Sequence, residues 1–202
     1  GVRLGSGASS ATSVGEGAHD IAAGGAVWHD GITYRMLEGA GTLRLGAQSG
    51  AWTDFGVGSD DVVTLPVFNF GVEHGVRPDG AALAYVVQGD PDGSRLTAKG
   101  RISIVANSTA VQAVFDTESA CGQAVFHEAG TLHFPDGQGI AVDRPCFIIY
   151  SAMADGRVCL TMAEGGRDAG MLRVTLSGKR TNAGGVSLPQ GDRAGAPVTL
   201  VL

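Results

Sequence analysis

Residues 62–88 read VVTLPVFNFGVEHGVRPDGAALAYVVQ, and this stretch decides the class of fold. Its first part, Val62–Val72, carries apolar side chains at both odd and even positions, which is typical of a strand buried on both faces. A second apolar run covers Ala82–Gln88. The polar sequence between them contains Gly75, Pro78 and Gly80, and their backbone preferences favour a reversal of the chain. We therefore predict a hairpin of two strands in the middle of a β-sandwich core.

Similar turn signals recur along the rest of the chain. Pro-Asp-Gly occurs again in DPDGS and FPDGQG, and ADGR separates the apolar runs CFIIYSA and VCLTMAE. In MLRVTLSG, Leu172, Val174 and Leu176 alternate with polar residues, so one face of this strand is buried. No long segment keeps the i, i+3, i+4, i+7 apolar spacing of a helix. These patterns predict an all-β chain, folded as a large antiparallel β-sandwich with little or no helix.

The composition limits the classes of partner. Of the 202 residues, 44% are hydrophobic and 17% are charged, which is typical of a globular protein. The net charge is −6 and the chain has no cluster of Lys and Arg, so we expect neither nucleic acid nor an anionic membrane as a partner. No apolar run approaches the roughly 18–20 residues of a membrane span. The chain starts at Gly1 without a visible targeting signal, which suggests a processed or excised piece of a longer protein.

The domain organisation is predicted from a change in composition. Residues 1–25 are rich in Gly, Ala and Ser, with sparse Val and Ile, and we interpret them as a flexible lead-in or linker. Strand signals begin at Ala26, so residues 26–202 are predicted to form the β-sandwich domain.

The sequence contains few patterns that indicate chemistry. It lacks HExxH, GxSxG, a phosphate-binding loop and GxGxxG, so we predict no cofactor and no catalytic residue. His127 and His133 could bind a metal together with Glu128, or they could be two half-exposed strand histidines; we predict no metal site. The three cysteines, Cys121, Cys146 and Cys159, have no CxxC spacing, and the last two lie in apolar runs, which favours free buried thiols.

Four residues are candidates for contact with a substrate: His74, Arg77, Trp28 and His29. His74 lies at the tip of the predicted hairpin, where it could contact a substrate or bond a backbone carbonyl and order the loop. Trp28 and His29 lie close in sequence to Tyr34. An exposed Trp could stack on a sugar ring, and the alternative is core packing.

Three stretches, in order, resemble the β-sandwich region of the family 8 polysaccharide lyases, which include hyaluronate, chondroitin AC and xanthan lyases. WHDGITYRML followed by GAW is similar to that family's H-x-G-I-x-Y and G-x-W strand pair. FNFGVEHGVRPDGAALAYVV resembles its strand, HG-x-x-P turn and Y-x-Y strand, with Ala84 at one position of the last pattern. ISIVANSTAVQAVFD resembles I-x-I-L-x-N-x-x-x-Q-A-V. The resemblance covers about Val27 to Asp116 and implies a sandwich of the super-sandwich type.

The resemblance also implies a function. The family cleaves acidic polysaccharide by β-elimination, with an Asn, a His, a Tyr and an Arg in an upstream α/α-toroid domain. No position in this chain matches those catalytic motifs, so the chain is expected to be a non-catalytic support that is inactive alone. Expected partners are an acidic polysaccharide and the toroid domain, with self-association of the isolated chain, in a secreted or periplasmic setting. The alternative is a stand-alone carbohydrate-binding or structural module of a secreted protein.

Overall fold

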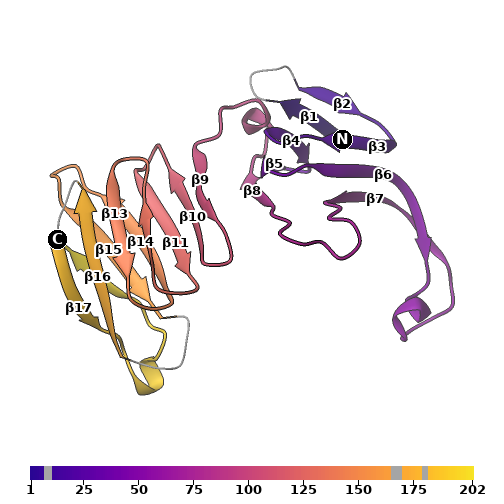
Figure 1. Cartoon of the computed structure of the whole chain (residues 1–202). Helices are drawn as coiled ribbons and strands as arrows, with labels where there is room; N and C mark the ends of the chain where they lie inside the picture. The colour runs from indigo at the N-terminus through magenta and orange to yellow at the C-terminus, as the bar shows by residue number, and fades with distance from the viewer. Residues whose placement is uncertain (7–10, 165–169, 179–181) are drawn as a thin grey trace. The chain divides into compact units, whose positions relative to one another are not determined.

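The chain folds into two compact units, residues 1–99 and residues 100–202, each of which is described separately (Figure 1). The computed structural model describes residues 1–6, 11–164, 170–178 and 182–202. All regular elements in these residues are antiparallel strands, apart from three short 3₁₀ turns, which confirms the all-β prediction. Across the same residues, we find no helix with the length and apolar character needed to cross a membrane. The single domain predicted for residues 26–202 is therefore corrected to two units.

The first unit contains two sheets. The larger sheet has the order β2-β1-β4-β5-β8 and the smaller one the order β3-β6-β7. The strands are β1 (Val2–Ser6), β2 (Thr12–Val14), β3 (Gly17–Ile21), β4 (Gly25–His29), β5 (Ile32–Glu38), β6 (Gly41–Gly50), β7 (Val63–Gly71) and β8 (Ala84–Gly89). The core between the sheets is built around Ile21, Val27, Met36 and Leu43.

The predicted lead-in at residues 1–25 is wrong, because this segment contains strands of both sheets. β1 pairs with β4 from Val2↔His29 to Ser6↔Gly25, and β3 pairs with β6. The alternate side chains Val2 and Leu4 pack against the core. The glycine-rich composition here reflects close packing between elements and tight turns, which is why it resembles the composition of a linker.

The predicted hairpin is wrong in its pairing, although both strands exist. β7 pairs with β6, from Thr42↔Gly71 to Gly50↔Val63, and β8 pairs with β5 in the other sheet. The connecting segment 72–83 therefore crosses from one sheet to the other. Only the second half of β7 is partly buried, whereas Val63 and Leu65 are exposed.

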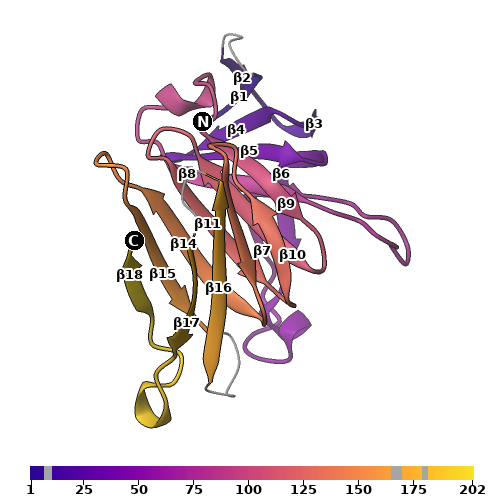
Figure 2. The same ribbon diagram turned by 60° about the vertical axis from the view of Figure 1, so that its left-hand side comes forward.

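The second unit also contains two sheets, with the orders β18-β15-β14-β11-β10-β9 and β12-β13-β16-β17 (Figure 2). The strands are β9 (Ile102–Asn107), β10 (Val111–Asp116), β11 (Cys121–Phe126), β12 (Gly130–His133), β13 (Gln138–Val142), β14 (Cys146–Ala152), β15 (Val158–Ala163), β16 (Met171–Gly178), β17 (Asn182–Ser187) and β18 (Val198–Val201). Buried side chains from both sheets form one core, which includes Phe134, Tyr150, Leu160 and Leu176.

Several sequence predictions for this unit are confirmed. β14 and β15 form the hairpin predicted around ADGR, and the pairing ends at Ala152↔Val158. The alternation predicted in MLRVTLSG is observed, since Leu172, Val174 and Leu176 are buried and their neighbours are exposed.

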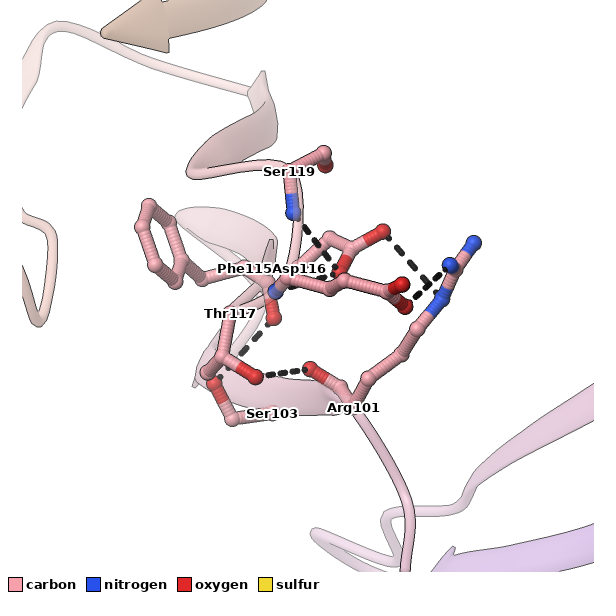
Figure 3. Close-up of polar contacts among 7 residues, drawn as sticks. Arg101, Ser103, Phe115, Asp116, Thr117 and Ser119 are labelled. Carbon is pink, nitrogen blue, oxygen red and sulfur yellow. Dashed lines mark hydrogen bonds and ion pairs between the residues drawn. The ribbon is translucent and has the colours of Figure 1, made fainter.

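Polar contacts fix the beginning of the second unit (Figure 3). The guanidinium of Arg101 lies 2.7 Å from Glu118 and 3.3 Å from Asp116, and Thr117 donates its hydroxyl to the carbonyl of Arg101 at 3.1 Å. Ser103 donates to the carbonyl of Phe115 at 3.3 Å. The hydrogen bond to Glu118 and the charge of Asp116 raise the pKa of Arg101. These contacts close the end of the β9–β10 pair next to the boundary between the units.

Candidate functional site

An open hollow lies at one end of the first unit, between the edges of its two sheets. It has a volume of 460 Å³ and is lined by Tyr34, Met36, Phe68, Phe70, Gly71, Val72, His74, Leu83 and Tyr85. β5 and β8 supply the side chains on one side, and β7 supplies those on the other. The segment 72–83 contributes the rest of the lining as it crosses between the sheets.

The register of β5 and β8 explains why aromatic side chains meet in this hollow. Met36 is paired with Tyr85, and Tyr34 is paired with Val87, so these four side chains share the inner face of the larger sheet. The ring of Tyr34 lies 5.7 Å from that of Phe68 and 6.2 Å from that of Phe70, measured between centroids. Tyr85 is 55% exposed although it belongs to this inner face. The hollow thus has an aromatic wall with one ring open to solvent.

The segment 72–83 carries two of the predicted site residues, of which only His74 is part of the lining of the hollow. His74 lines the hollow and is exposed, and Arg77 is also exposed. Arg77 has a φ of 55°, in the left-handed region that a side chain other than glycine seldom adopts. Arg44 on β6 lies 4.0 Å from Glu73 in the same segment. Arg44 is paired with Asn69, so its side chain lies on the face of the smaller sheet opposite to Phe68 and Phe70.

Trp28 lies on the opposite face of the larger sheet and makes structural contacts there. Its indole Nε1 donates to the carbonyl of Asp90 at 2.7 Å, and the guanidinium of Arg3 lies 4.1 Å from its ring centroid. The carboxylate of Asp90 accepts from the hydroxyl of Thr33 at 2.6 Å. The guanidinium of Arg3 thus lies over the ring that we considered for stacking on a sugar, and Trp28 does not join His74 and Arg77.

His29 follows Trp28 on β4, so its side chain points to the inner face of the sheet. Its imidazole stacks on the ring of Phe68, with centroids 4.5 Å apart and an interplanar angle of 11°. His74 and Arg77 thus lie on one segment, whereas Trp28 and His29 point to opposite faces of the larger sheet. Whether any of these four residues contacts a substrate remains a prediction.

Sequence reasoning missed Tyr85 and the aromatic wall behind it. Tyr34 and Met36 are two residues apart, as are Tyr85 and Val87, so each pair lies on one face of its strand. This spacing reveals the aromatic wall once β5 and β8 are known to be neighbours. Because we paired β7 with β8, these residues were not recognised as sharing one face.

The second unit contains the remaining residues that we considered for chemistry. Among the described residues, no three His, Cys, Asp or Glu side chains gather closely enough to hold a metal. His127 lies 3.3 Å from the side-chain oxygen of Gln112. All three cysteines are free thiols, although only Cys146 is fully buried. Burial, together with the charges of Asp143 and Glu164, raises the pKa of the Cys146 thiol to about 12, so this thiol is a poor nucleophile.

The residues of the hollow offer one kind of contact that proteins use for sugars. An exposed aromatic ring such as that of Tyr85 can pack against the apolar face of a sugar. The lining consists mainly of apolar side chains, with His74 and the tyrosine hydroxyls as its polar groups.

Comparison with known proteins matches both units to models of one family. The model described as polysaccharide lyase family 8, super-sandwich domain, matches residues 3–99. The model described as polysaccharide lyase family 8, C-terminal beta-sandwich domain, matches residues 103–167. Each model therefore falls within one of the two units.

Individual relatives agree with these models. Chondroitinase-AC from Pedobacter heparinus is 30% identical over 180 residues, which cover 85% of this chain and 25% of the relative. A structure of chondroitinase AC lyase, determined in a study of its active site with enzyme–oligosaccharide complexes, matches with a TM-score of 0.81 and 25% identity. That match covers 98% of this chain and 30% of the other.

A more distant match concerns the fold alone. The X-ray structure of a mutant chondroitin AC lyase from Streptomyces coelicolor A3 has a TM-score of 0.61 and 19% identity, and covers 85% of this chain and 22% of that chain. The chain thus spans about a quarter of the length of the curated relative that it matches.

Proposed function

The chain belongs to polysaccharide lyase family 8, and from this premise we propose that it is the non-catalytic β-sandwich part of a lyase. The lyase would cleave uronic-acid-containing polysaccharide by β-elimination. The observation that carries this proposal is the match of two successive units to the two β-domain models of one family, in the order of the chain.

The chemistry is assigned to a helical α/α-toroid domain outside this chain. A β-elimination needs a base for the proton next to the carboxylate, an acid for the leaving oxygen, and groups that neutralise the carboxylate. The chain covers only 25% of Chondroitinase-AC, which leaves room in a complete enzyme for a separate catalytic domain. The β-sandwich would support this domain and help to hold the polysaccharide.

The hollow beside segment 72–83 is the part of the chain best suited to contact the polysaccharide. Tyr85 offers an exposed ring, while Arg77, on the segment that also carries His74, supplies exposed positive charge in a chain whose net charge is −6. An acidic polymer would otherwise be repelled by the chain as a whole. We therefore expect binding to depend on these few groups.

The test compares activity of the complete gene product with activity of the 202-residue chain. The complete product should generate unsaturated uronate from chondroitin, which absorbs ultraviolet light, and the chain alone should not. Product formation by the purified chain would place the active site within it and overturn the proposal. A complete product without lyase activity on chondroitin, hyaluronan or xanthan would also count against it.

Variants in the complete product test the hollow. Tyr85→Ala and Arg77→Ala should each raise KM about tenfold at nearly unchanged kcat, which corresponds to ~1.4 kcal/mol of lost binding. Arg193→Ala, which removes an exposed guanidinium from the second unit, is the matched control and should leave KM unchanged. If Tyr85→Ala and Arg77→Ala had the same KM as the control Arg193→Ala, the hollow would not be a binding site for the polysaccharide.

A stand-alone carbohydrate-binding module is the second candidate, and the exposed ring of Tyr85 is the observation that favours it. Binding of chondroitin by the chain at an affinity equal to that of the complete product would support this candidate.

For either candidate we propose a secreted or periplasmic location, because a polymeric substrate lies outside the cytoplasm. Cell fractionation tests this location.

A further inference from the structure

The distal halves of β6 and β7 form an arm, residues 47–67, that extends beyond the sheets of the first unit (Figure 1). β3 pairs with β6 only from Gly41 to Leu45, so the arm is a ribbon of two strands. An isolated two-stranded ribbon is marginally stable in water. The arm therefore lacks the support that the other strands of this unit receive from their neighbours.

One face of the arm is apolar and exposed. Val63 and Leu65 lie on this face, and Leu65 is 60% exposed. The tip adds Trp52, which is 62% exposed, and Phe55, which is 81% exposed. These side chains border a shallow hollow of 300 Å³. The opposite face carries the pair Ser49 and Thr64, whose hydroxyls form a hydrogen bond of 2.7 Å, and the small pair Ala47 and Pro66.

The tip is ordered, although its aromatic side chains face solvent. η1 (Trp52–Phe55) begins with reciprocal bonds, in which Ala51 N donates to the Asp54 carboxylate at 2.9 Å and Asp54 N donates to Ala51 O at 3.1 Å. Gly58 lies so close to Trp52 that a Cβ there would come within 2.7 Å of the Trp52 Cβ. A preorganised turn that presents Trp and Phe has the features of an interface anchor.

The charges of the arm select among possible occupants. Residues 47–67 contain Asp54, Asp60 and Asp61 and neither Lys nor Arg. An acidic polysaccharide or an anionic membrane would be repelled by three carboxylates, and a second copy of the arm would bring like charges together. What remains is a protein surface that is apolar in its centre and basic at its rim.

We propose that the arm docks through Trp52, Phe55 and Leu65 onto an apolar, basic-rimmed surface of the helical domain in the complete lyase. This inference rests on the proposed function, because that proposal supplies the helical domain. The chain covers 25% of its curated relative, so most of a complete enzyme of that size would lie outside this chain and could supply such a surface. Docking buries the apolar face that the arm exposes to water. It also gives the two-stranded ribbon packing contacts that it lacks in the isolated chain.

Hydrogen exchange of the arm amides tests the docking without relying on turnover. Amides of residues 51–62 should exchange at least about tenfold more slowly in the complete gene product than in the 202-residue chain. The double variant Trp52→Ala/Phe55→Ala should lose this protection, while amides of β4 and β5 keep theirs and report an intact fold. Ser49→Ala, on the face opposite to Val63 and Leu65, is the matched control and should retain the protection.

Equal exchange rates in the chain and in the complete product would overturn the docking. Protection that appears in the isolated chain on addition of chondroitin sulfate would assign the arm to the polysaccharide instead. Protection that grows with the concentration of the isolated chain would assign it to a second copy. An active lyase with an unprotected arm would refute only the docking, whereas a protected arm in a complete product without lyase activity would refute only the proposed function.

Discussion

A Cβ built on Gly5 would lie 2.8 Å from the Cγ of Leu96 and 2.8 Å from its carbonyl oxygen. β1 is thus pressed against η2 (Ser94–Leu96), and Leu96 is fully buried at this contact. Glycine is required at position 5 because any side chain would enter the space of the Leu96 backbone, which cannot move without shifting the turn.

Gly5→Ala should therefore lower the free energy of unfolding by about 1–3 kcal/mol, the usual cost of overpacking. Urea unfolding of the chain measures this change. Gly89→Ala is the matched control, because Gly89 is also a strand residue and has no atom within 4 Å of its would-be Cβ. Equal loss of stability in the two variants would contradict the role of the Leu96 contact.

The contact between Gly5 and Leu96 also explains why the first strands were missed in the sequence. A glycine that permits close approach and a glycine in a linker give the same composition, and the difference lies in a partner 91 residues away. The all-β class, in contrast, was predictable, because turn residues and alternation are local signals. The family resemblance was also predictable, because it rests on three short motifs that occur in the family's order along the chain.

The pairing of β7 and β8 could not be derived from local signals. Both strands were predicted, but sheet membership depends on long-range register, which places Tyr85 opposite Met36. For the same reason, only part of the candidate site could be predicted from the sequence. His74 and Arg77 were predicted from their loop, whereas the neighbouring aromatic wall depends on which strands are adjacent. Trp28 was considered as a surface residue because sequence does not reveal that Arg3 covers its ring.

Arg35 offers a second test, since its buried guanidinium holds segment 90–98 against the larger sheet. It donates to the carbonyls of Arg95, Leu96 and Ala98 at 2.8, 3.1 and 3.1 Å, and to that of Gly24 at 3.2 Å. Burial lowers its pKa from the ordinary value. An ammonium group cannot reproduce this fork of donors.

Arg35→Lys should accordingly lower stability by about 2–4 kcal/mol, because several carbonyls lose charged donors in a buried position. Thermal and urea unfolding measure this loss. Arg44→Lys on β6 is the matched control, since Arg44 is exposed and its pairing with Glu73 spans 4.0 Å. A lysine at position 35 that preserved stability would show that the charge alone suffices.

The role of His74 is tested by stability and binding measured together. The side chain of His74 is exposed. Among the described residues we find no hydrogen bond to its imidazole ring, so a structural role for His74 in ordering the turn is not supported. His74→Ala should change the free energy of unfolding by less than about 0.5 kcal/mol, as exposed substitutions usually do. A loss above 1 kcal/mol would restore the structural interpretation of the turn.

Tyr150 in the second unit gives the last prediction. Its ring is fully buried and stacks on Phe134 with centroids 5.2 Å apart, and its hydroxyl donates to the carboxylate of Asp136 at 2.5 Å. Tyr150→Phe keeps the ring and removes the hydrogen bond. Because the acceptor is charged, we expect a loss of about 1.5–3 kcal/mol at pH 8.

The pH dependence of this loss identifies the phenol proton as its origin. Burial, and then the hydrogen bond and charge of Asp136, raise the pKa of Tyr150 above the ordinary value of 10.0. The unfolded chain therefore releases this proton above about pH 10 while the folded chain retains it, so the folded state binds more protons there. The contribution of Tyr150 is fully present below pH 10 and falls by up to ~1.4 kcal/mol per pH unit above it. Urea unfolding of both proteins between pH 8 and 11 should show a constant difference up to about pH 9.5 that shrinks at higher pH. A difference that stays constant to pH 11 would mean that Tyr150 ionises equally in both states.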